Sequence, residues 1–201
     1  MNSQLSAYEH DVLLEASQIA AGNSVKSVKS VVGQKVVIVP PELLITSMEH
    51  IADAMGKPED KKTIVLVEIT GEAHGAIVLL VDPQNVDSLL ASVDESLRAS
   101  ALEEMTNIVA GAALGGMSRL LGIVFLQTVP VTSTDMVRAV VNEIVSEIGE
   151  KSSQILCSII GLKVGPLDIP VSLYLLFDEA TTQAIINAGK SAAGTYNVST
   201  H

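Results

Sequence analysis

The sequence has very few aromatic residues, a single cysteine and few basic residues. It contains three Tyr, two Phe and no Trp among 201 residues, so it lacks the rings on which single-stranded nucleic acids stack. Cys157, the one cysteine, cannot form an intramolecular disulfide, which suits a reducing compartment. Twelve Lys and Arg stand against 23 Asp and Glu, for a net charge of −11. This charge repels nucleic-acid phosphates and anionic lipids, so we expect neither nucleic acid nor a membrane as a partner.

No targeting or membrane segment is predicted either. Residues 1–9 are polar and lack the basic and apolar regions of a signal peptide, so we expect a cytoplasmic protein. Ile108 to Val131 is long enough to cross a bilayer, but Arg119 interrupts it at a substantial energetic cost. The segment is therefore interpreted as a helix followed by a strand.

The chain repeats itself at a fixed spacing. Residues 11–22 align with residues 100–111 at an offset of 89 positions, and the same offset places Gly33 over Gly122 and Pro41 over Pro130. Later the offset grows to 96, where Asp82 lies over Asp178, so the second copy has about seven extra residues in a loop. We interpret this as an internal duplication within one domain of residues 1–201. The first copy spans about residues 8–93 and the second about 95–189, with 190–201 expected to form a flexible tail.

The hydrophobic pattern predicts an α+β fold. Helices are expected at about residues 8–31, 48–55, 86–93, 95–121, 134–148 and 178–188, with Asp94 or Ser92 capping the fourth. Strands are expected at 36–39, 42–44, 63–69, 76–81, 123–129, 155–164 and 169–177. Because the strands come as hairpins, the sheet should be largely antiparallel, with the long helices packed on it. The duplication predicts pseudo-two-fold symmetry.

Common catalytic motifs are missing. The sequence has no glycine-rich phosphate loop, nucleophile elbow or His-Glu-x-x-His. Its four histidines lack ligand spacing, so no metal site is predicted. Cys157 lies in an apolar run and is expected to be a small core residue.

What the sequence does contain is a polar stripe on the second long helix. At about 100° per residue, the stripe comprises Ser100, Glu104, Asn107, Gly111 and Ser118, beside an apolar band of Ala101, Met105, Ile108 and Ala112 that is expected to face the core. Such a stripe is typical of an ordinary solvated helix face. Its repetition in the first copy favours a function.

The repeated stripe resembles a known family. The pattern Asp/Ser-x-x-x-Glu-x-x-Asn, followed after twenty-two residues by Pro and present twice, resembles the CheC family of chemotaxis phosphatases, which includes CheX and FliY relatives. The second copy fits completely with Ser100, Glu104, Asn107 and Pro130; the first has Asp11, Glu15, Gln18 and Pro41 and departs from the family at Gln18.

The resemblance implies an enzyme that removes the phosphoryl group from the aspartate of phosphorylated CheY, with CheD as a further partner. Glu104 and Asn107 would be the catalytic residues. The Asn107 amide would hold and aim the attacking water, and Glu104 would engage a cation on the partner. Ser100 and Pro130 would support the site. Mg²⁺ would belong to the response regulator, so the chain itself would need no cofactor.

Gln18 has one more methylene than Asn and would misplace the water. We therefore expect the first site (Asp11, Glu15, Gln18 and Pro41) to be degenerate and the second site to work. An alternative stays open, in which the protein is a non-enzymatic adaptor that binds CheY, CheD or the flagellar switch.

Overall fold

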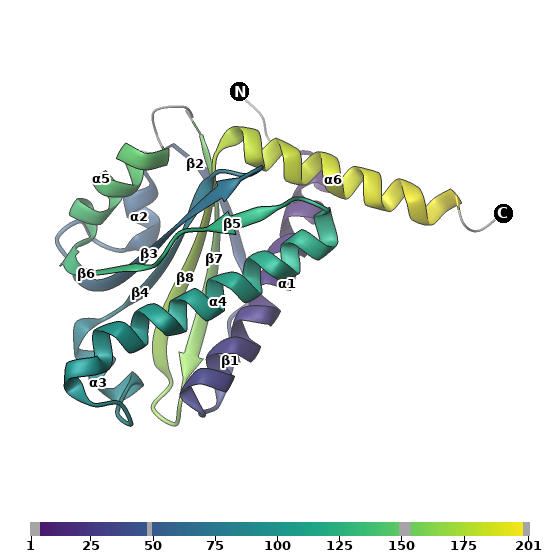
Figure 1. Cartoon of the computed structure of the whole chain (residues 1–201). Helices are drawn as coiled ribbons and strands as arrows, with labels where there is room; N and C mark the ends of the chain where they lie inside the picture. Colours follow the sequence, from purple (N-terminus) through teal and green to yellow (C-terminus); the bar gives the residue numbers. More distant parts are fainter. Residues whose placement is uncertain (1–4, 48–49, 149–153, 199–201) are drawn as a thin grey trace.

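The computed structural model describes residues 5–47, 50–148 and 154–198 and has an α+β fold built on an eight-stranded antiparallel sheet (Figure 1). The helices are α1 (Ala7–Val32), α2 (Ile51–Met55), α3 (Pro83–Leu89), α4 (Arg98–Leu121), α5 (Val137–Ile148) and α6 (Glu179–Val198). The strands are β1 (Val36–Ile38), β2 (Glu42–Thr46), β3 (Lys61–Gly71), β4 (Gly75–Val81), β5 (Phe125–Gln127), β6 (Val131–Met136), β7 (Ile155–Val164) and β8 (Ile169–Phe177). The predicted fold class is confirmed.

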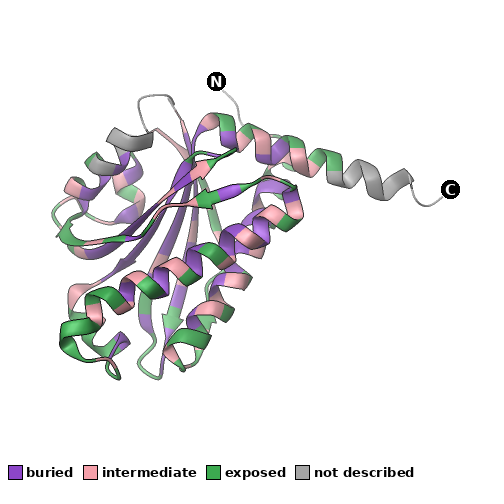
Figure 2. Ribbon diagram, viewed as in Figure 1, coloured by how far each residue is buried: buried purple, intermediate pink, exposed green. Residues whose placement is uncertain are grey.

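Helices cover both faces of the sheet. Successive side chains of a strand point to opposite faces. In β4, Ile77 and Leu79 join the core formed with α1, α4 and α6, while Val78 and Leu80 join a smaller core with α2 and α5. The central strands are consequently buried along most of their length (Figure 2). This explains why β4 is an unbroken apolar run rather than an alternating one.

The two halves exchange strands. The sheet order is β1-β7-β8-β4-β3-β5, with β2 also pairing with β7 and β6 with β3. The first half thus supplies β1 and β2 to a strand of the second half, and the second half supplies β5 and β6 to a strand of the first. At the centre, Val78 of β4 lies opposite Tyr174 of β8, 96 positions later, which is the offset of the repeat there. The pseudo-two-fold axis therefore passes between these two residues.

The strand register shows that the extra residues of the second copy are inserted at two places. Leu66 pairs with Val131, and Ile159 pairs with Glu42, the residue 89 positions before Val131. The offset between β3 and β7 is consequently 93. Four residues are inserted before β7, and three more lie in the turn between β7 and β8, which together account for the predicted seven.

Both long helices end in the same way. Gly33 and Gly122 follow α1 and α4 with φ of 65° and 68°, a left-handed conformation that glycine adopts without steric cost. Each helix is thereby stopped three residues before its strand, and β1 and β5 begin at equivalent positions of the repeat.

Several predicted boundaries were wrong, and three of them have a clear physical reason. Helix α6 runs to Val198 instead of ending at 188, and it packs closely on α1, since a Cβ on Gly189 would lie 2.3 Å from Val12. Strand β6 replaces the predicted loop and helix start, because its mostly exposed polar residues on an edge strand give no apolar pattern. Helix α3 begins at Pro83, three residues early, since proline suits the first turn. Within the described ranges, no helix combines the length and apolar character needed to cross a membrane.

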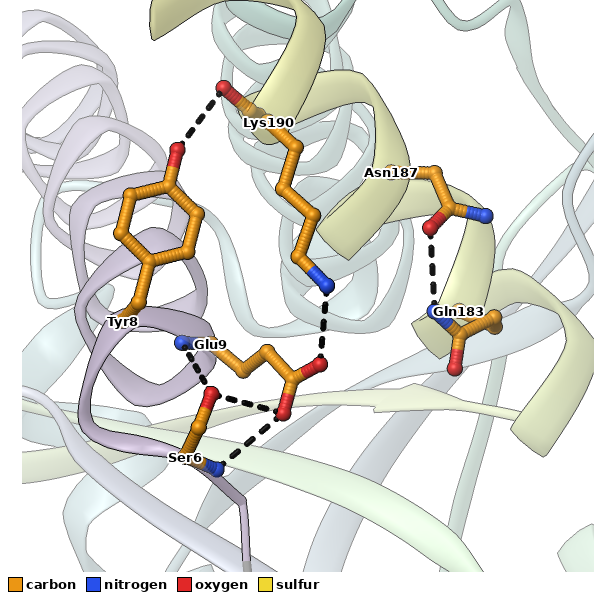
Figure 3. A network of polar contacts seen from close by, with 7 residues as sticks. Ser6, Tyr8, Glu9, Gln183, Asn187 and Lys190 are labelled. Carbon is orange, nitrogen blue, oxygen red and sulfur yellow. Dashed lines mark hydrogen bonds and ion pairs between the residues drawn. The ribbon is translucent and has the colours of Figure 1, made fainter.

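The start of α1 is tied to α6 by a polar network (Figure 3). Ser6 caps the helix: the Glu9 backbone N–H donates to Ser6 Oγ at 3.3 Å, and Ser6 N donates to Glu9 Oε2 at 3.1 Å. Lys190 Nζ of α6 donates to Glu9 Oε1 at 3.0 Å. The Lys190 hydrogen bond, followed by those from Ser6, lowers the pKa of Glu9 from 4.5 to about 2.

We predict that Glu9→Gln lowers the melting temperature at neutral pH and that this loss disappears in acid. A lowered folded-state pKa gives stability that is complete above the unfolded value of about 4.5 and lost as the pH falls through about 2. Thermal unfolding of both proteins from about pH 7 towards pH 2 measures the difference. Glu15→Gln, exposed on the same helix, is the control. A Glu9→Gln difference that stays constant with pH would contradict the assignment.

We also predict that Gly75→Ala destabilises the sheet centre by about 1–3 kcal/mol. A Cβ on Gly75 would lie 2.0 Å from the backbone oxygen of Leu176 in β8, which cannot move without disturbing the central strand pair. Gly115→Ala, in α4, is the matched control: its Cβ would meet only Arg119 Nη1, at 3.6 Å, and alanine favours the helix by up to about 1 kcal/mol. Urea unfolding compares the two, and equal effects would refute the prediction.

Candidate active site

Helix α4 carries the candidate site and has a fixed start. A 3₁₀ turn, Glu95–Leu97, leads into it, and Asp94 caps this turn by accepting from Ser96 N at 3.0 Å and Ser96 Oγ at 2.7 Å. These hydrogen bonds lower the pKa of Asp94. Of the two predicted caps, Asp94 is the one that acts, although it caps the turn that precedes the helix.

A cleft of about 290 Å³ lies between α4 and the β5–β6 connection. Its lining residues are Ser100, Glu103, Glu104, Asn107, Gln127, Thr128, Val129 and Pro130. All four residues of the second predicted motif therefore line one cleft. Ser100 and Glu104 are exposed, Asn107 is half-buried and Pro130 is buried.

The side chain of Asn107 is held by Gln127. Gln127 Nε2 donates to Asn107 Oδ1 at 2.6 Å and to the Asn107 backbone oxygen at 3.2 Å. A backbone carbonyl can only accept, so Gln127 must turn its NH₂ group towards Asn107. The Asn107 carbonyl oxygen in turn faces Gln127, which leaves the Asn107 NH₂ group pointing away from β5.

The connection that forms the other wall of the cleft is fixed to the sheet. Thr128 N donates to the Glu68 backbone oxygen, and Thr128 Oγ1 accepts from Glu68 N, both at 3.0 Å. Pro130 is buried two residues later and restricts the backbone at this point. Val129, between them, is 83% exposed. The wall therefore presents an exposed apolar side chain from a backbone that is fixed on both sides of it.

Of the described residues that line the cleft, two are carboxylates and none is cationic. Glu103 Oε1 accepts from the Thr132 backbone N–H at 3.2 Å, which ties α4 to the edge strand β6. Glu104 is exposed one residue further on and makes no hydrogen bond or ion pair with a described residue. The cleft repels a free anion, while Glu104 remains available for a cation brought by another molecule.

The first motif is arranged differently. Asp11, Glu15 and Gln18 are exposed and Pro41 is half-buried. Three positions that are polar around the second site are apolar in the first copy, 89 positions earlier: Glu103, Gln127 and Thr132 correspond to Leu14, Ile38 and Leu43. The first copy therefore has neither the Gln127 donor nor the Glu103 tie.

The core face of α4 differs from the predicted one, although Met105 is buried as expected. Ile108 is 40% exposed rather than buried. The buried face is centred on Leu102, Met105, Val109, Ala113 and Met117, and the polar stripe lies opposite this face rather than beside it. Because α4 carries apolar residues on several sides, periodicity alone did not distinguish the two bands.

The sequence pattern did not predict Gln127 or Glu103 as residues of the site. Both can be recognised when the two copies are compared position by position, because each is a polar residue where the other copy has an apolar one, close to the repeated motif.

Cys157 is buried as predicted, and burial raises the pKa of its thiol to about 12. Among the described residues, no group of three or more His, Cys, Asp or Glu side chains could hold a metal ion.

A family model and several solved structures show what this chain resembles. The model of the CheC-like family matches residues 97–133, which contain the whole second motif and its proline. The family resemblance seen in the repeated motif is thus confirmed, and the chain has the fold shared by CheC-like, CheX and FliY proteins.

Individual relatives show the same resemblance in sequence and in fold. The chain is 24% identical over 152 residues to the CheY-P phosphatase CheC of Bacillus subtilis, covering 70% of this chain and 73% of that protein. Its fold is similar to that of Thermotoga maritima FliY, with a TM-score of 0.73, 17% identity, and coverage of 94% of this chain and 100% of that chain. It is also similar to a chain of the CheX–CheY–BeF₃–Mg²⁺ complex from Borrelia burgdorferi, with a TM-score of 0.54, 18% identity, and coverage of 82% and 97%.

Proposed function

We propose that this protein hydrolyses the phosphoaspartate of a phosphorylated CheY response regulator. The observation that carries the proposal is the cleft in which Glu104 and Asn107 lie together on a rigid helix, with the Asn107 amide held in one orientation. The curated relative from Bacillus subtilis is named a CheY-P phosphatase, and a protein of similar fold is found with CheY, BeF₃ and Mg²⁺.

Asn107 supplies the positioning that acyl-phosphate hydrolysis requires. Its Oδ1 has two lone pairs: one accepts from Gln127 Nε2, and the other accepts an O–H of the attacking water. The water oxygen forms a new bond to phosphorus while the bond from phosphorus to the aspartate oxygen breaks. The carboxylate leaves with the electron pair, and the proton of the water goes to the released phosphate. A loose transition state asks little of the nucleophile, so no strong base is needed.

Glu104 fixes the partner in register. Its exposed carboxylate suits an ammonium group beside the phosphoaspartate of the partner, and such a pair sets orientation more than affinity. Because no cationic side chain lines the cleft, the charge of the phosphoryl group has to be neutralised from the partner's side. A metal ion and a lysine on the response regulator would fulfil that requirement.

We predict that Asn107→Ala lowers the rate of phosphate release from phosphorylated CheY by about 100-fold or more, because the water is no longer aimed. Gln18→Ala should change the rate by less than about twofold, since the first site lacks the donor that would hold an amide. Phosphate release under steady-state conditions measures both, with circular dichroism to verify folding. Loss of turnover in Gln18→Ala with a normal rate in Asn107→Ala would overturn the assignment.

Catalysis also has to be separated from mere binding. A phosphatase shortens the lifetime of phosphorylated CheY when present at one-hundredth of its concentration, whereas an adaptor acts only when it is present in equal amounts. We expect the substoichiometric effect. An effect at equal concentrations alone would favour the adaptor, for which CheD and the flagellar switch remain the other predicted partners.

A further inference from the structure

We propose that Gln127 is a positioning residue of the phosphatase reaction, which holds Asn107 in its working orientation and makes the second site the active one. This inference rests on the function proposed above. Gln127 is the last residue of β5 and lies across the cleft from α4. Its single NH₂ group donates to both oxygens of Asn107, at 2.6 and 3.2 Å.

The two hydrogen bonds work as a clamp because they involve the backbone as well as the side chain. The bond to the Asn107 backbone oxygen anchors the Gln127 amide to α4, and the bond to Oδ1 then fixes the rotation of the Asn107 amide. Rotation of that amide by half a turn would place NH₂ against NH₂ and break the shorter bond. Asn107 is thereby kept with one lone pair of Oδ1 and its NH₂ group available to the cleft.

The presence of Gln127 lowers the stability of the folded protein. Gln127 Oε1 is buried and accepts no hydrogen bond from a described residue, and a buried unpartnered acceptor lowers the stability of a protein. The equivalent residue of the first copy, Ile38, avoids that cost. A glutamine at this position therefore serves the site rather than the core.

The first copy shows what the site is without the clamp. Ile38 ends β1 as Gln127 ends β5, and its side chain cannot donate a hydrogen bond. Gln18, at the position of Asn107, is exposed and has no such anchor. The two sites therefore differ in two respects: the first lacks the hydrogen-bond donor that Gln127 provides in the second, and Gln18 has one more methylene than Asn107.

The test uses two substitutions of similar size. Gln127→Leu removes the whole amide, and Gln127→Glu keeps the shape but replaces the NH₂ donor with an oxygen that repels Asn107 Oδ1. Both should lower kcat for phosphate release from phosphorylated CheY by about 10- to 100-fold and leave KM within about twofold. Gln127→Leu should also melt at the same temperature as the wild type or higher, because it removes the buried acceptor. Ile38→Leu, at the equivalent position of the first copy, is the control and should keep the wild-type kcat.

A double-mutant cycle separates positioning from a structural role. In an Asn107→Ala background, Gln127→Leu should have no further effect on kcat, because the clamp has nothing left to hold. An unchanged kcat in Gln127→Leu, additive effects in the cycle, or a fall in melting temperature that matches the loss of activity would each overturn the proposal.

A readout of Asn107 itself keeps the proposal distinct from the proposed function. In ¹⁵N-labelled protein, the side-chain NH₂ signals of Asn107, identified by their loss in Asn107→Ala, should shift in Gln127→Leu, because the hydrogen bond to Oδ1 of the same amide is lost. If the wild type fails to hydrolyse phosphorylated CheY, the function is wrong, and so is a role for Gln127 in it, even where the NH₂ signals shift. If the wild type is active and the signals do not change, only the clamp is refuted.

Discussion

The fold depends on the antiparallel pairing of β4 with β8 at the centre of the sheet. This pairing joins the two halves along an axis between Val78 and Tyr174, and each half then completes the sheet of the other with its two short strands. Burial of both faces of the central strands follows, because helices of both halves have to cover one continuous surface. The position of α4 is a product of this arrangement rather than of the second half alone.

The site combines a helix with a loop that is fixed to the opposite half. Asn107 comes from α4, while the connection after β5 is held by Thr128 against Glu68 of β3. Helix α4 and the β5–β6 connection thus set the width of the cleft, and Gln127 between them orients the side chain of Asn107. Reaction chemistry that relies on placing one water needs such rigidity more than it needs a strong base.

Much of this could be predicted because it is encoded locally or by repetition. Glycine, proline and glutamate at constant spacing revealed both long helices, their ends and the motif at Ser100, Glu104, Asn107 and Pro130. What could not be predicted depends on contacts between distant segments. The edge strand β6 carries no apolar pattern of its own and is defined by its pairing with β3. Ile108 faces solvent because neighbouring apolar residues face the core. Gln127 contacts Asn107 only because folding brings β5 and α4 together.

The strand exchange also constrains how the two copies can diverge. The first copy carries a changed motif, and its exposed residues can vary without harm to the sheet. Its strand β3, however, supports β5 and β6 beside the second site, so substitutions there would be felt at a cleft formed by the other half. Each half therefore depends on the other for strands of its sheet, and removal of either half would leave a strand of the other without its partners.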